Sequence, residues 1–201
     1  PALPRRIGRF LFDRIRDLNT IERYLTAAYA KRDAFDDELV KQIRSCTEGR
    51  GGHAAFASIL WSPPAKQSNE DSETEAFAKK LERVQCDVLL LFGKDDPWCK
   101  PAFARKMLTT LQYSSPSPIQ RYVELANVGH CPNHEAPTAV GNVVARWIAA
   151  REGHRGRDSL VLVEGGKGIV TEPWGEIEVK EKGLDDFEVG VWDRITAAMM
   201  V

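Results

Sequence analysis

The sequence predicts an α/β protein built around a parallel sheet. The run 87–92 is almost wholly apolar and ends at Gly93, which is typical of a short strand buried on both faces. The segment 121–125 contains a tyrosine and a valine, which favour strands. Apolar residues at helical spacing fill 101–112, between the two strands, and 137–148, after the second. Strands and helices that alternate in this way indicate a parallel sheet with helical crossovers.

Residues 1–72 have a different pattern and are predicted to form a helical segment. Apolar side chains recur at spacings of three and four residues in 7–18, 21–28 and 39–43, as on one face of a helix. A further helix is predicted at 53–60. A polar loop with two prolines follows it and separates this segment from the α/β part.

The α/β part is expected to span 73–150, and a β-rich extension is expected over 151–201. Two strands are predicted in the extension, at 160–163 and 176–179, with glycines supplying the turns. The extension contains no group of residues that predicts chemistry by itself.

Composition excludes several classes of protein. The chain has 28 Lys and Arg against 29 Asp and Glu, so it lacks the positive surplus of a nucleic-acid-binding protein. No apolar stretch reaches the ~20 residues that a membrane-spanning helix needs. No Cys-x-x-C pair occurs, so we expect free thiols in a soluble intracellular protein, with no metal site and no cofactor. The cysteines are Cys46, Cys86, Cys99 and Cys131.

Candidate catalytic residues follow the two predicted strands. In open α/β sheets, residues that act on ligands lie just beyond the carboxyl ends of the strands. The loop 93–98 supplies Asp96 there, and the loop 128–137 supplies His130. A carboxylate could hold the tautomer of an imidazole, whose other nitrogen would accept a proton from a nucleophile. Alternatively, the aspartate caps the next helix and the histidine bonds to backbone, because many α/β proteins have such residues in these loops.

These residues also carry a resemblance to a known family. The segment 90–98, followed by Gly129 and His130, resembles the last third of the α/β-hydrolase fold. The continuation 130–137 (His-Cys-Pro-Asn-His-Glu-Ala-Pro) is similar to plastid hydrolases of the pheophytinase and chlorophyll dephytylase type. The helical stretch 21–64 looks like the cap region of that group. The segments 174–176 and 191–195 are similar to an extension found in some of its members.

The resemblance implies a partial α/β-hydrolase fold and a role for each candidate residue. It assigns the triad acid to Asp96, three positions after Gly93, and the triad base to His130, in the order that the family requires. Asp95 is the neighbour that could be mistaken for the acid, and His134 is expected to be structural. The implied substrate is a small hydrophobic carboxylic ester, with the phytyl ester of a chlorophyll derivative as the candidate. The implied location is the chloroplast.

The chain departs from the family in lacking a nucleophile. No Gly-x-Ser-x-Gly segment and no His-Gly-rich oxyanion loop occur in it. Ser45, Ser58 and Ser62 lie in predicted helices or turns. We therefore expect a fragment or partial gene product of a serine hydrolase, beginning at the cap and inactive by itself. The alternative is a non-catalytic binding or receptor module of the same fold.

Overall fold

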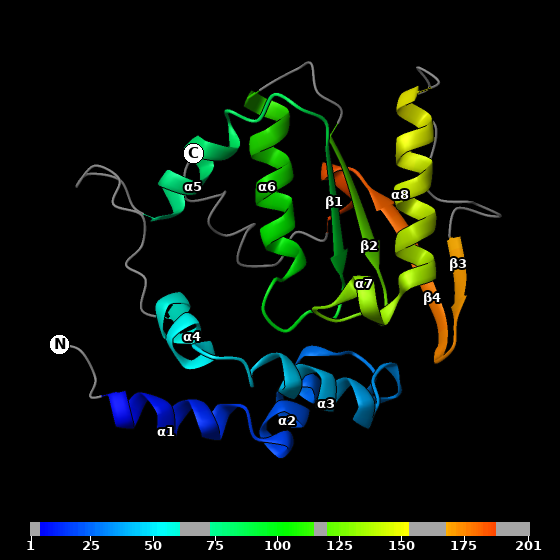
Figure 1. Ribbon diagram of the computed structural model, residues 1–201. Helices are drawn as coiled ribbons and strands as arrows, with labels where there is room; N and C mark the ends of the chain where they lie inside the picture. The colour runs from blue at the N-terminus through cyan, green and yellow to red at the C-terminus, as the bar shows by residue number, and fades with distance from the viewer. Residues whose placement is uncertain (1–4, 61–72, 115–119, 153–167, 188–201) are drawn as a thin grey trace, which may run out of the picture.

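The structure, a computed structural model, describes residues 5–60, 73–114, 120–152 and 168–187 (Figure 1). It is a mixed α/β fold with a four-stranded sheet in the order β1-β2-β4-β3. No described helix has both the length and the apolar character needed to cross a membrane.

A parallel pair of strands forms one half of the sheet. Strands β1 (Val88–Gly93) and β2 (Gln120–Leu125) pair in parallel and are connected through helix α6 (Pro101–Ser114). The predicted α/β class, with parallel strands joined by a helix, is thus confirmed. β4 (Gly175–Lys182) pairs antiparallel with β2, and β3 (Gly168–Glu172) pairs antiparallel with β4.

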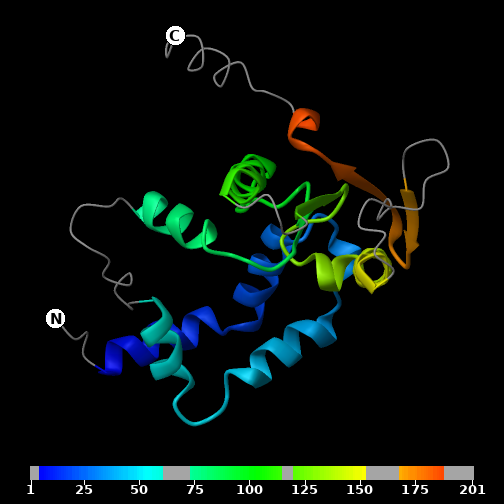
Figure 2. The ribbon, with the colours of Figure 1, turned by 90° about the horizontal axis from the view of Figure 1, so that it is seen from above.

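Helices cover both faces of the sheet. α6 lies on one face, and α8 (Pro137–Glu152) lies on the other (Figures 1 and 2). Because side chains alternate along β2, Tyr122 points towards α6 and Val123 towards α8. The core on the α6 side contains Leu90, Ala104, Leu108, Leu111, Tyr122 and Phe187. The core on the α8 side contains Val123, Leu125, Val128, Ala136, Ala139, Val143, Ile177 and Val179.

The described part of the C-terminal extension continues this sheet. The strand predicted at 176–179 lies within the longer β4, and β3 was not predicted. The strand predicted at 160–163 and the segment 191–195 lie outside the described residues.

Glu172 ties the extension to α8. Its buried carboxylate accepts hydrogen bonds from the backbone N–H of Ala139 (2.9 Å) and the hydroxyl of Thr138 (3.0 Å). A carboxylate at a helix N-terminus satisfies otherwise unpaired donors and interacts favourably with the helix dipole. The end of β3 is thereby fixed against the first turn of α8.

The helices of residues 5–60 form an N-terminal helical layer with its own core. The layer lies across the end of the sheet at which β1 and β2 finish (Figure 1). Aspartates cap two of its helices: Asp17 accepts from the N–H of Asn19 (3.1 Å), and Asp36 from that of Leu39 (2.8 Å). Its core cluster contains Ile21, Ala28, Tyr29, Ala34, Phe35 and Val40. The helices before β1 are α1 (Arg5–Ile15), α2 (Leu18–Ala28), η1 (Arg32–Ala34), α3 (Asp37–Cys46), α4 (Gly52–Leu60) and α5 (Glu73–Leu81).

Replacing Ile177 with alanine is expected to lower the free energy of unfolding by about 2–5 kcal/mol, because the side chain is fully buried under α8. The matched control is Ile169→Ala on β3, where the side chain is 65% exposed and the expected change is within about 0.5 kcal/mol. Urea unfolding of both variants measures the difference. Equal effects at the two positions would contradict the placement of β4 in the core of the sheet.

Candidate functional site

The loops that follow β1 and β2 are hydrogen-bonded to each other. The N–H of Lys94 donates to the carbonyl of Leu125 (2.8 Å), and that of Asp95 donates to the carbonyl of Val128 (3.0 Å). Since the two strands are parallel, their carboxyl ends lie at the same edge of the sheet. The loop that carries Asp96 is thereby placed beside the loop that carries His130.

Asp96 is the residue that reaches His130. Its Oδ2 lies 2.9 Å from His130 Nδ1, and its side chain is only 6% exposed. Its Oδ1 accepts hydrogen bonds from the backbone N–H groups of Trp98 (2.8 Å) and Cys99 (2.9 Å). The turn after β1 therefore fixes the carboxylate through one oxygen and leaves the other to bond the imidazole.

The neighbouring Asp95 makes a different contact. Its Oδ2 accepts a hydrogen bond from the backbone N–H of Asn127 (2.9 Å). Asn127 adopts a left-handed backbone conformation (φ 61°), which asparagine tolerates better than most residues. Asp95 thus supports the turn after β2, and the two adjacent aspartates have separate partners.

His130 is held by its backbone and remains accessible through its ring. Its N–H donates to the carbonyl of Ala28 (2.8 Å), at the end of α2. The ring of Trp98 packs edge-on against the imidazole, with 4.7 Å between ring centroids. The side chain is 39% exposed, and no described residue forms a hydrogen bond with Nε2. With Nδ1 bound to Asp96, Nε2 is the nitrogen that could exchange a proton with a substrate or nucleophile.

The environment of Asp96 favours its ionised form. Burial raises the pKa of the carboxyl, but hydrogen bonds from Cys99, His130 and Trp98 together outweigh burial and lower the pKa below its ordinary value. At neutral pH Asp96 is therefore a carboxylate. In that form it can fix the Nδ1–H tautomer of His130 and stabilise the imidazolium.

The lowered pKa predicts how Asp96 affects stability as the pH changes. A carboxyl whose pKa is lower in the folded chain contributes stability that is fully present above its unfolded pKa of about 3.9. That contribution is lost as the pH falls through the folded pKa. We expect Asp96→Asn to be less stable than the wild type at pH 7, with a gap that narrows below about pH 4. Urea unfolding at a series of pH values tests this, and a gap independent of pH would contradict it.

Sequence reasoning assigned no role to Glu135, although the structure places it beside the site. Its side chain is only 1% exposed and accepts hydrogen bonds from three backbone N–H groups. The only sequence feature that could have drawn attention to Glu135 is its place between His134 and the pair Ala136-Pro137. The ring of His134 packs edge-on against that of Tyr29, with 5.7 Å between the ring centroids.

One group among the described residues has the donor atoms for a metal ion. Asp96, Cys99 and His130 each offer a ligand atom, and these atoms lie within 4.8 Å of one another. Both oxygens of Asp96 already accept hydrogen bonds, one of them from His130. A metal ion bound there would therefore compete with the contact between Asp96 and His130. All four cysteines are free thiols, and burial raises the pKa of Cys131.

Two of the three serines considered as nucleophiles lie on exposed helix positions. The hydroxyl of Ser45, on α3, donates to the carbonyl of Gln42 (2.7 Å). The hydroxyl of Ser58, on α4, donates to the carbonyl of Ala55 (2.7 Å). Neither lies on the strand-to-helix turn that exposes a hydrolase nucleophile. Ser62 lies outside the described residues.

Comparison with known proteins supports the resemblance to α/β-hydrolases. The chain is 28% identical over 175 residues to a protein of Arabidopsis thaliana named "Pheophytinase, chloroplastic". The match covers 87% of this chain and 33% of the relative, so the chain spans about a third of the relative's length. No protein-family model matches the chain, and no solved structure matches it.

Proposed function

We propose that this chain is the C-terminal part of a serine α/β-hydrolase that cleaves carboxylic esters, with Asp96 as the triad acid and His130 as the base. The hydrogen bond between Asp96 Oδ2 and His130 Nδ1 is the observation that carries the proposal. It joins an ionised, buried carboxylate to an imidazole whose other nitrogen faces away from it.

The proposed mechanism needs a serine and oxyanion donors from sequence beyond the 201 residues. The serine oxygen attacks the ester carbonyl while His130 Nε2 takes the serine's proton. His130 then gives that proton to the departing alcohol, leaving an acyl-enzyme. Water, deprotonated by the same nitrogen, releases the acid and restores the serine. Asp96 remains ionised throughout and stabilises the imidazolium, while backbone N–H groups bind the oxyanion.

Two observations support a partial fold. The chain spans about a third of its relative. Among the described strands, β1 pairs with β2 alone, so its other edge offers a place for a further strand. Unpaired strand edges of this kind are usually paired or covered in native proteins.

The proposed substrate is hydrophobic, with the phytyl ester of a chlorophyll derivative as the candidate. The relative's name suggests this class of substrate and a chloroplast location. Trp98 supports it, because this ring contacts His130 and is 56% exposed, which offers an apolar surface beside the reacting nitrogen.

A non-catalytic binding module of the same fold is the alternative. The absence of a Gly-x-Ser-x-Gly segment from the 201 residues favours it. In that case the contact between Asp96 and His130 would be retained without a nucleophile.

The transcript that encodes the chain decides between the two. An in-frame Gly-x-Ser-x-Gly upstream is expected, and the longer protein should hydrolyse an activated ester and a phytyl ester. The 201-residue chain should show no turnover and no labelling by a serine-directed fluorophosphonate. A transcript that starts at or just before Pro1 would favour the binding module. Turnover by the short chain that the probe abolishes would identify one of its own serines as the nucleophile.

A further inference from the structure

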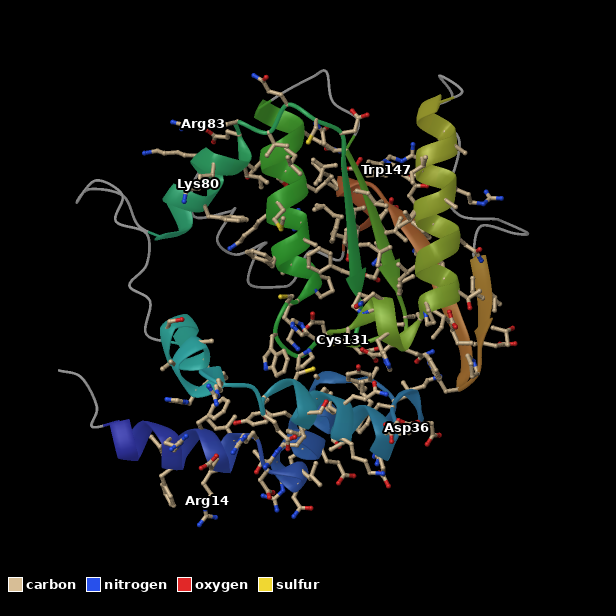
Figure 3. All side chains as sticks on the ribbon, in the orientation of Figure 1. Arg14, Asp36, Lys80, Arg83, Cys131 and Trp147 are labelled. Carbon is tan, nitrogen blue, oxygen red and sulfur yellow. The ribbon has the colours of Figure 1, made fainter. Side chains whose placement is uncertain are left out.

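We propose that Glu135 is a positioning residue for His130, and that it joins the loop that carries His130 (128–137, the histidine loop) to the chain segment at the end of α2. The effect of Glu135 on catalysis rests on the proposed function, whereas its effect on the position of His130 can be measured on the 201-residue chain. Cys131, at the start of the short helix α7 (Pro132–Glu135), lies where the sheet meets the N-terminal helices (Figure 3).

The carboxylate of Glu135 binds the backbone N–H groups of the two residues that flank His130. Its Oε2 accepts from the N–H of Gly129 (2.9 Å), and its Oε1 accepts from the N–H of Cys131 (3.1 Å). Hydrogen bonds to a buried carboxylate are stronger than those between neutral groups. The backbone that carries the imidazole is therefore held immediately before and immediately after His130.

The same carboxylate reaches into the N-terminal helical layer. Its Oε2 also accepts from the N–H of Ala30 (2.8 Å), two residues beyond the end of α2. The carbonyl of Ala28 accepts from the N–H of His130 (2.8 Å), and the ring of Tyr29 lies against that of His134. Three consecutive residues of the helical layer thus contact the histidine loop.

Gly129 permits this close approach. A Cβ atom at Gly129 would lie 2.2 Å from the carbonyl oxygen of Ala28 and 2.8 Å from the nitrogen of Ala30. Real Cβ atoms do not approach backbone atoms so closely. The loop and the helical layer are therefore in direct backbone contact, with Glu135 pairing the donors of both.

The variant Glu135→Gln tests the proposal with little change in shape. Glutamine offers one acceptor oxygen in place of two, so at least one of the three N–H groups loses its partner. If the glutamine oxygen replaces Oε2, we expect the amide hydrogen of Cys131 to exchange about tenfold faster or more, and if it replaces Oε1, those of Gly129 and Ala30. We also expect the backbone of His130 to shift, which weakens the hydrogen bond from Nδ1 to Asp96.

Nitrogen-15 NMR of the histidine rings provides the readout. In the wild type, Nδ1 of His130 should carry a slowly exchanging proton in the hydrogen bond to Asp96, and Asp96→Asn should abolish that signal. Glu135→Gln should broaden or shift it, whereas His53 on α4 serves as an internal control. Glu176→Gln, the same change at an exposed position, should leave all these signals unaltered. A folded Glu135→Gln variant with unchanged His130 signals would overturn the proposal.

A second variant covers the case in which Glu135→Gln does not fold. Ala30→Pro removes this N–H donor and puts a ring carbon in its place, which cannot fit beside Glu135 Oε2 at the present distance, so the link between the carboxylate and the helical layer is broken while Glu135 itself is retained. Tyr29, with φ −90° and ψ 140°, already has the backbone conformation that a residue before proline requires. This variant should shift the His130 ring signals in the same direction, and unchanged signals would refute the link to the helical layer. Because no readout is enzymatic, these results stand whether or not a nucleophile exists upstream.

Discussion

In the longer hydrolase that we propose, Asp96→Asn is expected to lower kcat by about 10³- to 10⁴-fold, because the loss of this carboxylate disturbs the tautomer of the base. Asparagine can turn its NH₂ group towards His130 Nδ1, which would then act as an acceptor. The proton would move to Nε2, and Nε2 could no longer take a proton from the serine. Steady-state kinetics with an activated ester measure the loss.

Asp95→Asn is the matched control for that experiment. Asp95 bonds the backbone N–H of Asn127, and an asparagine oxygen can accept the same hydrogen bond. We expect kcat to stay within about threefold of the wild type, since the contact between Asp96 and His130 is untouched. A larger loss in Asp95→Asn than in Asp96→Asn would reverse the assignment of the triad acid.

The elements that the sequence predicts are those whose signal is local. The apolar run of β1 and the helical spacing of apolar residues in α6 and α8 can each be recognised within a short stretch of sequence. The contact between Asp96 and His130 could be predicted because both residues lie in loops that follow predicted strands, and the carboxyl ends of parallel strands meet at one edge.

The features that were missed depend on residues far apart in the chain. The antiparallel pairing of β4 with β2 joins residues 54 to 60 positions apart, from Leu125 with Val179 to Tyr122 with Lys182, and no local pattern specifies such a partner. β3 begins with a glycine and has one strongly exposed isoleucine, so its apolar signal is weak. The contact between Ala30 and Glu135 spans 105 positions, and Glu135 carries no sign of its three donors in the residues around it.

Replacing Gly93 with alanine is expected to destabilise the chain by about 3–5 kcal/mol, because the end of β1 has no room for a side chain. A Cβ atom there would lie 2.1 Å from the carbonyl oxygen of Gly129 and 2.4 Å from that of Val128. Both obstacles are backbone atoms, so neither can move aside by rotating a side chain. The two loops would have to separate, which would weaken the hydrogen bonds that place Asp96 beside His130.

Gly141→Ala is the control, since it adds the same methyl group to an exposed position of α8 with no atom within 4 Å of the new Cβ. Alanine favours helices over glycine, so this variant should be more stable than the wild type by about 0.5–1 kcal/mol. Urea unfolding compares the stabilities of the two variants. A result in which Gly141→Ala folds and Gly93→Ala does not would also agree with the prediction. A Gly93→Ala variant within about 1 kcal/mol of the wild type would mean that the loops after β1 and β2 can separate at little cost. The short contact between Asp96 and His130 would then need another source of rigidity.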